Sequence, residues 1–317
     1  MKKVLITGAN GFIGHYLVKE FLKDHIVVCI LRPETNNIDR LENIKDKIEI
    51  IYHDIKDNYD YLLEKLKDVK LILHAGGNPS SESSILHPIS TVMDNVIGTA
   101  HLLELSKKLE IERFVYYGAG EIFGPIAPGT HSNENDVYNC VSPYGASKAG
   151  GQELCIAYAN AFMIPVSILH LPNTFGPRSQ SKRFPVISIK KILNDDTLDI
   201  HVDENNLIGG RRWMHAEDVA LHTRFVLTNQ KNIYEKWNST GNEFISNLDF
   251  AEKIASILGK KLKYKFVPVQ RKGHNTYFSM SADKFYNLGW KEDINIYDRL
   301  TDTVNWYKEN IKWLTDY

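Results

Sequence analysis

The sequence has few cysteines and no arrangement of residues that suggests a bound metal. Its 317 residues include only Cys29, Cys140 and Cys155, which are far apart and form no Cys-x-x-Cys pair. An odd number of distant cysteines predicts neither a disulfide framework nor a zinc site. The twelve histidines also lack the spacing of metal ligands. We therefore expect no metal.

Long hydrophobic runs and an excess of one charge are absent as well. No apolar run is long enough to span a bilayer, and the run after the first three residues is too short for a signal peptide. The net charge is −1, with no block of like charge that would attract nucleic acid or an anionic membrane. These observations predict a cytoplasmic protein whose partners are small molecules.

What the sequence does contain is a glycine-rich turn near its start, between a short apolar strand and an amphipathic helix. Gly8 would make the turn, Gly11 would let a pyrophosphate approach the backbone, and Gly14 would let the helix pack on the strand. The unpaired N–H groups at the helix start, near Phe12 and Ile13, suit a pyrophosphate. The alternative is an ordinary glycine-rich turn, but this strand and helix context favours dinucleotide binding.

The same turn resembles a known family. Gly-x-x-Gly-x-x-Gly after a Thr is similar to the short-chain dehydrogenase/reductase superfamily, and Gly-Phe-Ile-Gly resembles its extended branch of nucleotide-sugar enzymes. Strands and helices alternate in the following chain, which predicts an α/β fold with a doubly wound parallel (Rossmann) sheet. We place this dinucleotide-binding domain at residues 1–172, with 212–240 returning to it, and a smaller C-terminal substrate-binding α/β lobe at 173–317.

The second strand, Ile26–Leu31, ends at Arg32, the position that meets the adenosine ribose in this fold. An acidic residue there would accept a hydrogen bond from the 2′-hydroxyl of NAD, whereas an Arg pairs with the 2′-phosphate of NADP. The sequence therefore slightly favours NADP over NAD as a tightly bound cofactor, with Arg40 as a second candidate partner of the phosphate. The alternative is that Arg32 is only a solvated strand end.

The resemblance implies further contacts. It places Asp54 and Ile55 at the adenine ring, and Asn95 within the family's Asn-x-x-Gly-Thr segment, as cofactor-binding residues. Small residues after the fourth strand, Ala75 and Gly76, would let the backbone pass close to the cofactor. The Ser-rich segment that follows includes Ser84, which we assign to the sugar hydroxyls, although a plain solvated loop is an alternative.

A Tyr and a Lys four residues apart, Tyr144 and Lys148, would share one face of a helix. A phenol with a pKa near 10 needs a nearby cation to act as a base at neutral pH. Lys148 supplies such a cation and would also hold the nicotinamide ribose. Tyr144 would then take the proton of a sugar hydroxyl while the carbon beneath it gives hydride to the cofactor. A surface pair is the alternative interpretation.

The chain departs from the family pattern just before this helix. The family carries a Ser or Thr that donates a hydrogen bond to the reacting oxygen, and this sequence has Ala119 there. Ser142, Thr130, Tyr117 or a bound water are the candidate replacements. Glu121 is retained.

Glu121 occupies the place where nucleotide-sugar 4,6-dehydratases and UDP-glucuronate decarboxylases carry a Glu. Once C4 of a sugar is a ketone, the C5 proton is acidic, and a carboxylate that removes it lets the C6 hydroxyl leave as water. The residue before it, Gly120, cannot serve as the acid. An exposed turn residue is an equally plausible interpretation of Glu121.

Three later residues are assigned to the substrate by resemblance alone. Asn173 follows the sixth strand, Arg212 is preferred to Arg211 as a partner of the diphosphate, and Arg271 is a second such partner. His170 stands where the family often has an Arg.

The sequence as a whole predicts an NAD(P)-dependent enzyme that modifies a nucleotide-diphospho-sugar through a transient 4-keto intermediate. The leading hypothesis is 4,6-dehydration, with Tyr144 as base for the 4-hydroxyl and Glu121 as base at C5. The alternatives are a nucleotide-sugar 4-epimerase, a 4-keto-sugar reductase, and a non-catalytic protein that binds the nucleotide sugar or dinucleotide. By resemblance we also expect a homodimer through residues 91–109 and 144–162, although their apolar residues could equally belong to the domain core.

Overall fold

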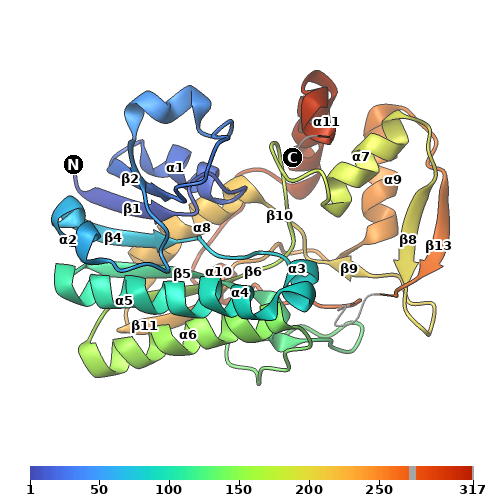
Figure 1. Cartoon of the computed structure of the whole chain (residues 1–317). Helices are drawn as coiled ribbons and strands as arrows, with labels where there is room; N and C mark the ends of the chain where they lie inside the picture. Colours follow the sequence, from blue (N-terminus) through green and yellow to red (C-terminus); the bar gives the residue numbers. More distant parts are fainter. Residues whose placement is uncertain (271–275, 316–317) are drawn as a thin grey trace.

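A seven-stranded parallel sheet forms the larger part of the computed structural model, which describes residues 1–270 and 276–315 (Figure 1). The strand order is β11-β6-β5-β4-β1-β2-β3, so the direction of winding reverses between β1 and β4. Ligands of open parallel sheets bind at such a switch point. The strands are β1 (Lys3–Thr7), β2 (Ile26–Leu31), β3 (Glu49–Tyr52), β4 (Val69–His74), β5 (Arg113–Ala119), β6 (Val166–Leu171) and β11 (Tyr234–Asn238).

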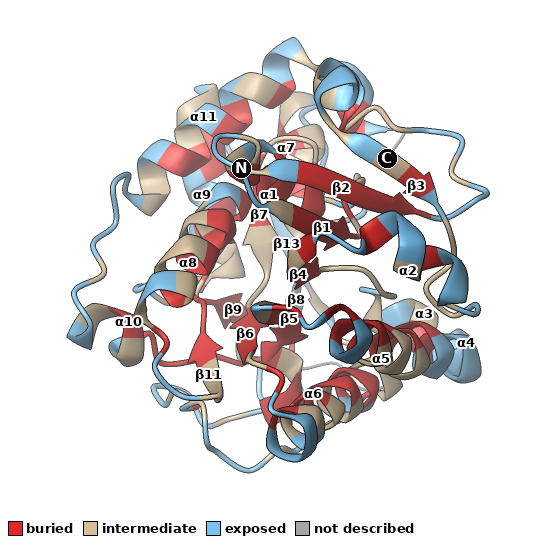
Figure 2. Ribbon diagram, turned by 90° about the vertical axis from the view of Figure 1, so that its left-hand side faces the viewer, coloured by how far each residue is buried: buried red, intermediate tan, exposed pale blue. Residues whose placement is uncertain are grey.

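Helices cover both faces of this sheet, which explains why its strands are apolar on both sides (Figure 2). One face packs against α1 (Gly14–Phe21), α8 (Ala216–Asn229) and α10 (Asp283–Asn287). The other packs against α2 (Asp60–Leu66), α5 (Gly98–Leu109) and α6 (Pro143–Phe162). This arrangement confirms the predicted α/β fold class.

The smaller lobe has a core of its own beyond the carboxyl end of the sheet (Figure 1, right). It contains α7 (Phe184–Leu193), α9 (Asn247–Leu258), α11 (Ile296–Glu309) and the 3-10 turn η4 (Ile311–Leu314). A parallel strand pair, β8 (Leu198–Val202) and β13 (Tyr264–Pro268), lies at its outer side. Two short pairs complete the lobe, β7 (Thr174–Phe175) with β10 (Met214–His215), and β9 (Gly210–Arg211) with β12 (Ile245–Ser246).

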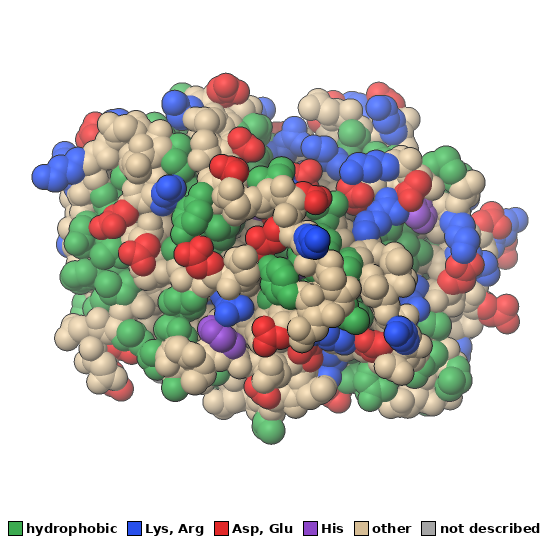
Figure 3. Space-filling model, turned by 180° about the vertical axis from the view of Figure 1, so that it is seen from behind, with side chains coloured by type: hydrophobic (Ala, Val, Ile, Leu, Met, Phe, Trp, Pro, Cys, Tyr) green, Lys and Arg blue, Asp and Glu red, His purple; other side chains and the backbone are tan. Residues whose placement is uncertain are grey.

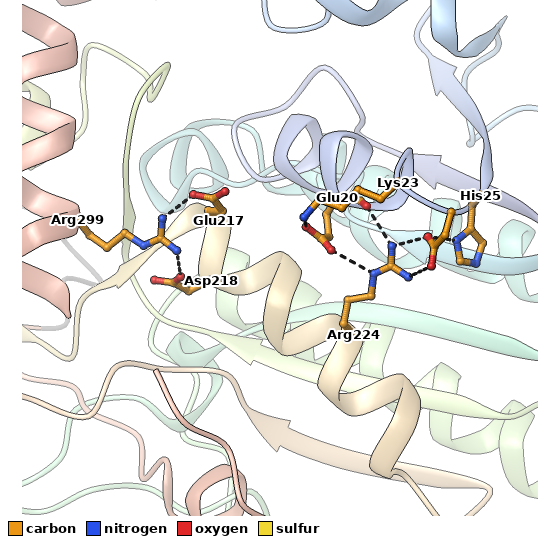
Figure 4. Close-up of polar contacts among 8 residues, drawn as sticks. Glu20, Lys23, His25, Glu217, Asp218, Arg224 and Arg299 are labelled. Atoms are coloured by element: carbon orange, nitrogen blue, oxygen red, sulfur yellow. Dashed lines mark hydrogen bonds and ion pairs between the residues drawn. The ribbon is translucent and has the colours of Figure 1, made fainter. Parts of the chain in front are cut away.

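The chain leaves the sheet after β6 and later returns to it through α8 and β11, which pairs with β6 in parallel. Two arginines tie α8 to its neighbours (Figure 4). Arg224 binds Asp24, which follows α1, at 2.5 Å, and the buried Arg299 of α11 binds Glu217 and Asp218 at 2.6 and 2.5 Å. The returning helix is therefore fixed both to the C-terminal end of α1 and to α11.

The structure refines two expectations about helices. The first helix begins at Gly14, not near Phe12, because Ile13 is its N-terminal flanking residue. The expected helix over 91–109 is divided into α4 (Pro88–Val92), a π-helical turn η2 (Met93–Ile97) and α5. Such π turns occur often at functional sites.

Charged side chains of both signs are interspersed over the face of the molecule in Figure 3, in keeping with the net charge of −1. Within the described ranges, no helix combines the length and apolar character needed to cross a membrane.

Candidate active site

A cavity of about 540 Å³ opens at the carboxyl ends of the central strands. Its lining includes all of the predicted cofactor residues, together with Glu121 and Asn173 from the predicted reaction and substrate sites. The predicted cofactor residues on its wall are Gly8, Gly11, Phe12, Ile13, Gly14, Arg32, Asp54, Ile55, Ala75, Gly76, Asn95, Tyr144 and Lys148. The fold thus brings into one cavity segments that are far apart in the sequence.

The glycine turn has no room for side chains at two of its positions. Gly8 has φ +67°, and a Cβ there would lie 2.6 Å from the carbonyl oxygen of Ala75. A Cβ on Gly14 would collide with the carbonyl oxygen of Gly8. At Gly11 a Cβ would crowd only Gly8, so its remaining side is open to the cavity. This backbone cradle fits a dinucleotide pyrophosphate.

A buried chain of hydrogen bonds joins the end of β1, just before the glycine turn, to the end of β4 and to α5. Thr99 donates to the carbonyl of Asn95 at 2.7 Å, so the Nε2–H of His74 donates to Thr99 Oγ1 at 3.0 Å. The other ring nitrogen of His74 then accepts from the Thr7 hydroxyl at 2.8 Å, and Thr7 Oγ1 accepts the N–H of Gly76. Burial lowers the pKa of His74 to about 3, so the ring is neutral at physiological pH. One ring nitrogen therefore donates a hydrogen bond and the other accepts one.

Asn95 joins the segment after β4 to helix α6. Its Oδ1 accepts the N–H of Asn78 at 2.7 Å, and its Nδ2 donates to the carbonyl of Asn78 and to Ser147 Oγ. The π turn carries this fully buried side chain. Asn95 therefore has a positioning role at the cavity wall that its motif does not reveal.

Tyr144 and Lys148 lie one helical turn apart at the start of α6, where Ser142 caps the helix and accepts the N–H of Gly145. Burial raises the pKa of the Tyr144 hydroxyl well above its usual value, Glu121 raises it further and the charge of Arg183 lowers it. Burial also lowers the pKa of Lys148 to about 8, and its Nζ lies over the Tyr116 ring at 4.3 Å.

Glu121 lies in the turn η3 (Gly120–Phe123) and lines the same cavity as Tyr144. Its Oε2 accepts a hydrogen bond from the Ser81 hydroxyl at 2.5 Å. The carboxylate is close enough to act on the pKa of Tyr144. The lining of one cavity thus contains both a carboxylate and a phenol. An oxidation followed by an elimination requires two bases of this kind.

None of the three side chains considered as replacements at Ala119 places its hydroxyl in the cavity. Tyr117 bonds Thr223 at 2.8 Å within the core. The hydroxyls of Ser142 and Thr130 are engaged locally, with the N–H of Gly145 and a nearby carbonyl. Ser81, which was not considered, brings a hydroxyl to Glu121 instead.

Two predicted substrate residues have side chains that are engaged elsewhere in this structure. Ser84 is fully buried; its hydroxyl donates to the carbonyl of Ser81 and accepts the N–H of Tyr144, so it supports α6 and does not face the sugar site. Arg212 is directed toward His131, with 3.0 Å between Nη2 and Nε2, and is not on the cavity wall. Neither Arg212 nor Arg211 is a lining residue of the cavity, so the preference for Arg212 over Arg211 stays a prediction.

Arg211 is the guanidinium beside the predicted substrate residue. Its Nε donates to Asn173 Oδ1 at 3.3 Å, and its Cζ lies 4.7 Å above the ring of Phe278. Both Asn173 and Phe278 line the cavity. Arg271 lies outside the described residues. His170 is fully buried and contacts Asn238 and Gln152, so it is part of the core.

The adenosine end of the cavity carries charges of both signs. Arg32 lies 3.7 Å from the carboxylate of Asp94, which also lies 3.3 Å from Lys56. Lys56 in turn approaches Asp54 at 3.3 Å. The other candidate, Arg40, donates to the backbone carbonyls of Arg178 and Asn10.

Arg183, at the N-terminus of α7, is a cavity residue that sequence reasoning missed. It lines the cavity and donates to Pro79 O and Gln180 Oε1, both at 3.4 Å. The pattern Arg-Phe-Pro marks a helix start because Pro favours the first helical turn. No local signal, however, indicates that this helix start faces Tyr144.

A doubly wound sheet with a phosphate cradle, and a Tyr–Lys pair facing it, define a dinucleotide-dependent enzyme. The chain belongs to the NAD dependent epimerase/dehydratase family, which matches residues 4–238. This match confirms the resemblance to extended short-chain enzymes of nucleotide sugars. Within the described part of the chain, no group of three or more His, Cys, Asp or Glu side chains is placed to hold a metal ion.

Similar proteins act on nucleotide sugars in more than one way. A dTDP-D-glucose 4,6-dehydratase of Dictyostelium discoideum is 25% identical, over 98% of this chain and 82% of that protein. A putative UDP-glucose 4-epimerase of Methanocaldococcus jannaschii is 29% identical, over 97% and 99%. The similarity therefore shows an enzyme class that modifies nucleotide sugars, and both 4,6-dehydration and 4-epimerisation occur among the similar proteins.

Two solved structures have the same fold throughout. The dTDP-glucose 4,6-dehydratase DesIV of Streptomyces venezuelae, solved with NAD, has a TM-score of 0.88 with 25% identity and covers 99% of both chains. The UDP-glucuronic acid 4-epimerase of Bacillus cereus, solved with UDP-glucuronic acid and NAD, has a TM-score of 0.86 with 26% identity, over 97% and 99%.

Proposed function

We propose that the protein catalyses the NAD(P)-dependent 4,6-dehydration of a nucleotide-diphospho-sugar through a transient 4-keto intermediate. The observation that carries this proposal is the position of Glu121, whose carboxylate shares a cavity wall with Tyr144 and Lys148. An epimerase needs no base at C5, whereas a dehydratase does. The dehydratases among the relatives support the same choice.

Each residue has a defined part in this reaction. Tyr144 takes the proton of the 4-hydroxyl, and the Lys148 ammonium stabilises the phenolate. A nicotinamide cofactor held by the cavity residues would supply the hydride chemistry, as acceptor of hydride from C4 and later its donor to C6. Glu121 removes the C5 proton, the C5–H electrons form the C5–C6 double bond, and the C6–O bond breaks as the same carboxyl group gives that proton to the hydroxyl, which leaves as water. When hydride is added at C6, C5 takes a proton from solvent, and Tyr144 gives its own proton back to solvent. We assign Asn173 and Arg211 to the substrate diphosphate.

Incubation of the purified protein with UDP-, GDP-, CDP- and dTDP-hexoses tests the proposal. We expect one sugar to yield a product lighter by one water in the mass spectrum. An isomer of unchanged mass would show the 4-epimerase, the second candidate, which the absence of an acid side chain at Gly120 favours. No conversion of any sugar would exclude both reactions.

We further propose NADP as the preferred cofactor, with Arg32 as the partner of the 2′-phosphate. The Arg32→Asp variant should bind NADP about 10- to 100-fold more weakly, since a charge-assisted hydrogen bond is worth about 1.5–3 kcal/mol. NAD affinity should change less than about threefold, because NAD lacks that phosphate. Calorimetric titration measures both affinities. Lys45→Asp, an equal charge change at an exposed surface site, is the control. Equal losses for both cofactors would contradict this assignment.

We also propose a homodimer in solution. Exposed apolar side chains gather on α3 (Ser81–Leu86), α4 and η2, beside the predicted interface helices; they are Ile85, Leu86, Ile89, Val92 and Met93. An apolar patch of this kind marks an interaction surface.

The double variant Ile89→Lys, Met93→Glu should convert the dimer to a monomer, because burying these charges is unfavourable. Light scattering coupled to gel filtration gives the mass. Ile311→Lys, an exposed apolar residue in η4, should leave the mass unchanged. A monomeric wild-type protein would contradict the proposal.

A further inference from the structure

Ser81 and Glu121 form a contact that the catalytic scheme above does not yet use. Ser81 is the first residue of α3, and its hydroxyl donates to Glu121 Oε2 at 2.5 Å. Among the described residues it is the side chain that hydrogen-bonds this carboxylate. Neighbouring positions offer no substitute, since Gly120 and Ala119 have no polar side chain.

The position of Ser81 is set by a hydrogen-bond network that begins at Asn95, a lining residue of the cavity. Asn95 pairs with both backbone groups of Asn78. Asn78 Oδ1 accepts the N–H of Ser80, and Ser80 caps α3 by accepting the N–H of Ser83. A hydroxyl fixed in this way has little freedom to turn from the carboxylate that it contacts.

The same short helix also holds Tyr144. The N–H of Tyr144 donates to Ser84 Oγ at 3.0 Å, and the Ser84 hydroxyl donates to the carbonyl of Ser81 at 2.7 Å. Ser81 therefore contacts the Glu121 carboxylate through its side chain and the Tyr144 backbone through Ser84. One helix thus links the base for the 4-hydroxyl to the base for C5.

We infer that Ser81 is the positioning residue of Glu121, and that α3 sets the separation of the two bases in the dehydration. This inference rests on the proposed function. A hydroxyl has a single proton, so donation to Oε2 leaves Oε1 as the oxygen that faces the substrate. Glu has several rotatable bonds, and the side chain loses conformational entropy when they are fixed. Ser81 orders the side chain before substrate binds, which a reaction step of defined geometry requires.

The test compares Ser81→Ala with the wild-type holoenzyme on the sugar that the wild type dehydrates. We expect kcat to fall about 10- to 100-fold, because misplacement of a reacting group by about 1 Å costs up to about 100-fold. KM should stay within about threefold. In a single turnover, absorbance at 340 nm should rise at the wild-type rate and then persist, because oxidation at C4 is intact while elimination is slow.

Two further variants separate positioning from general structural damage. Ser81→Thr retains the hydroxyl and should restore most of kcat. Ser90→Ala removes an exposed serine from α4 and should match the wild type. Circular dichroism and Tm of each variant check the fold.

Different results would overturn the inference in recognisable ways. If kcat of Ser81→Ala equals that of the wild type, Ser81 does not position Glu121. If the 340 nm rise itself is slowed, Ser81 acts at the C4 oxygen in place of the hydroxyl missing at Ala119, and the inference is wrong. A wild-type protein that never releases a product lighter by water overturns the proposed function, and the inference with it.

Discussion

Replacing Tyr144 with Phe is expected to lower kcat by about 100- to 10,000-fold, the range for removal of a general base. The phenol lies at the start of α6 on the cavity wall, where burial and Glu121 hold its pKa high in the free protein. It therefore needs the Lys148 cation and the positive nicotinamide ring to lose its proton. Without the hydroxyl, the reaction loses the base that the Lys148 cation supports at the 4-hydroxyl.

Binding should survive this change, because the Phe ring fills the same space. Titration calorimetry with the cofactor and the nucleotide sugar is expected to give affinities within about threefold of the wild type. Tyr158→Phe is the matched control, since Tyr158 lies on the same helix and bonds Glu104 outside the cavity. Unchanged turnover in Tyr144→Phe would contradict the catalytic assignment. A wild type that binds both ligands without turnover would be a non-catalytic binding protein.

Lowering the pH from 7.5 to 5.0 is expected to remove most of the protein's free energy of unfolding. Five histidines are buried without charge, and burial lowers the pKa of four of them to about 3 and of His170 to about 4. The four are His15, His74, His215 and His222. In the unfolded chain the pKa of each returns to about 6.5.

The sign follows from proton linkage. Between pH 6.5 and about 4 the unfolded state binds more protons, so stability falls as the pH falls. At pH 5 each buried histidine lowers the free energy of unfolding by about 2 kcal/mol. Five such losses approach the 5–15 kcal/mol that a typical domain has in total. Asp218 acts in the opposite direction, because burial raises its pKa to about 6. Its protonation stabilises the folded state by about 1 kcal/mol between pH 7.5 and pH 5.

Urea unfolding at a series of pH values measures this effect. His74→Gln should reduce the dependence on pH by about one proton near pH 5, whereas His87→Gln, at an exposed position, should leave it unchanged. A free energy of unfolding that is constant between pH 7.5 and 5.0 would show that these side chains are not buried as neutral groups in solution.

Local motifs predicted the fold, and the residues that they single out line one cavity, because the geometry of each motif is contained within a few residues. The turn with Gly8 and Gly14 requires a close approach of backbone to backbone, and only glycine allows it. The Tyr144–Lys148 spacing is one helical turn, which places both side chains on one face of α6. In each case the spacing of the residues in the sequence fixes how close their atoms lie in the fold.

The sequence carries no signal where the direction of one side chain, or a contact between distant segments, sets the position of a residue. Arg211 and Arg212 are adjacent, and successive side chains of an extended segment point to opposite faces, so composition could not separate them. The Ser-rich segment forms a helix, α3, whose phase turns Ser84 inward and Ser81 toward Glu121. Arg183 faces the reaction centre only because the smaller lobe folds back over the sheet.

The return of the chain to the sheet through α8 and β11 has a consequence for folding. A fragment ending at residue 172 would lack the edge strand that pairs with β6 and the helix that Arg224 and Arg299 tie in place. Its bare edge would be free to pair with other chains and aggregate. The larger lobe therefore depends on residues beyond 172 for its edge strand and one covering helix, and we expect most of the chain to be synthesised before the first half reaches a stable form.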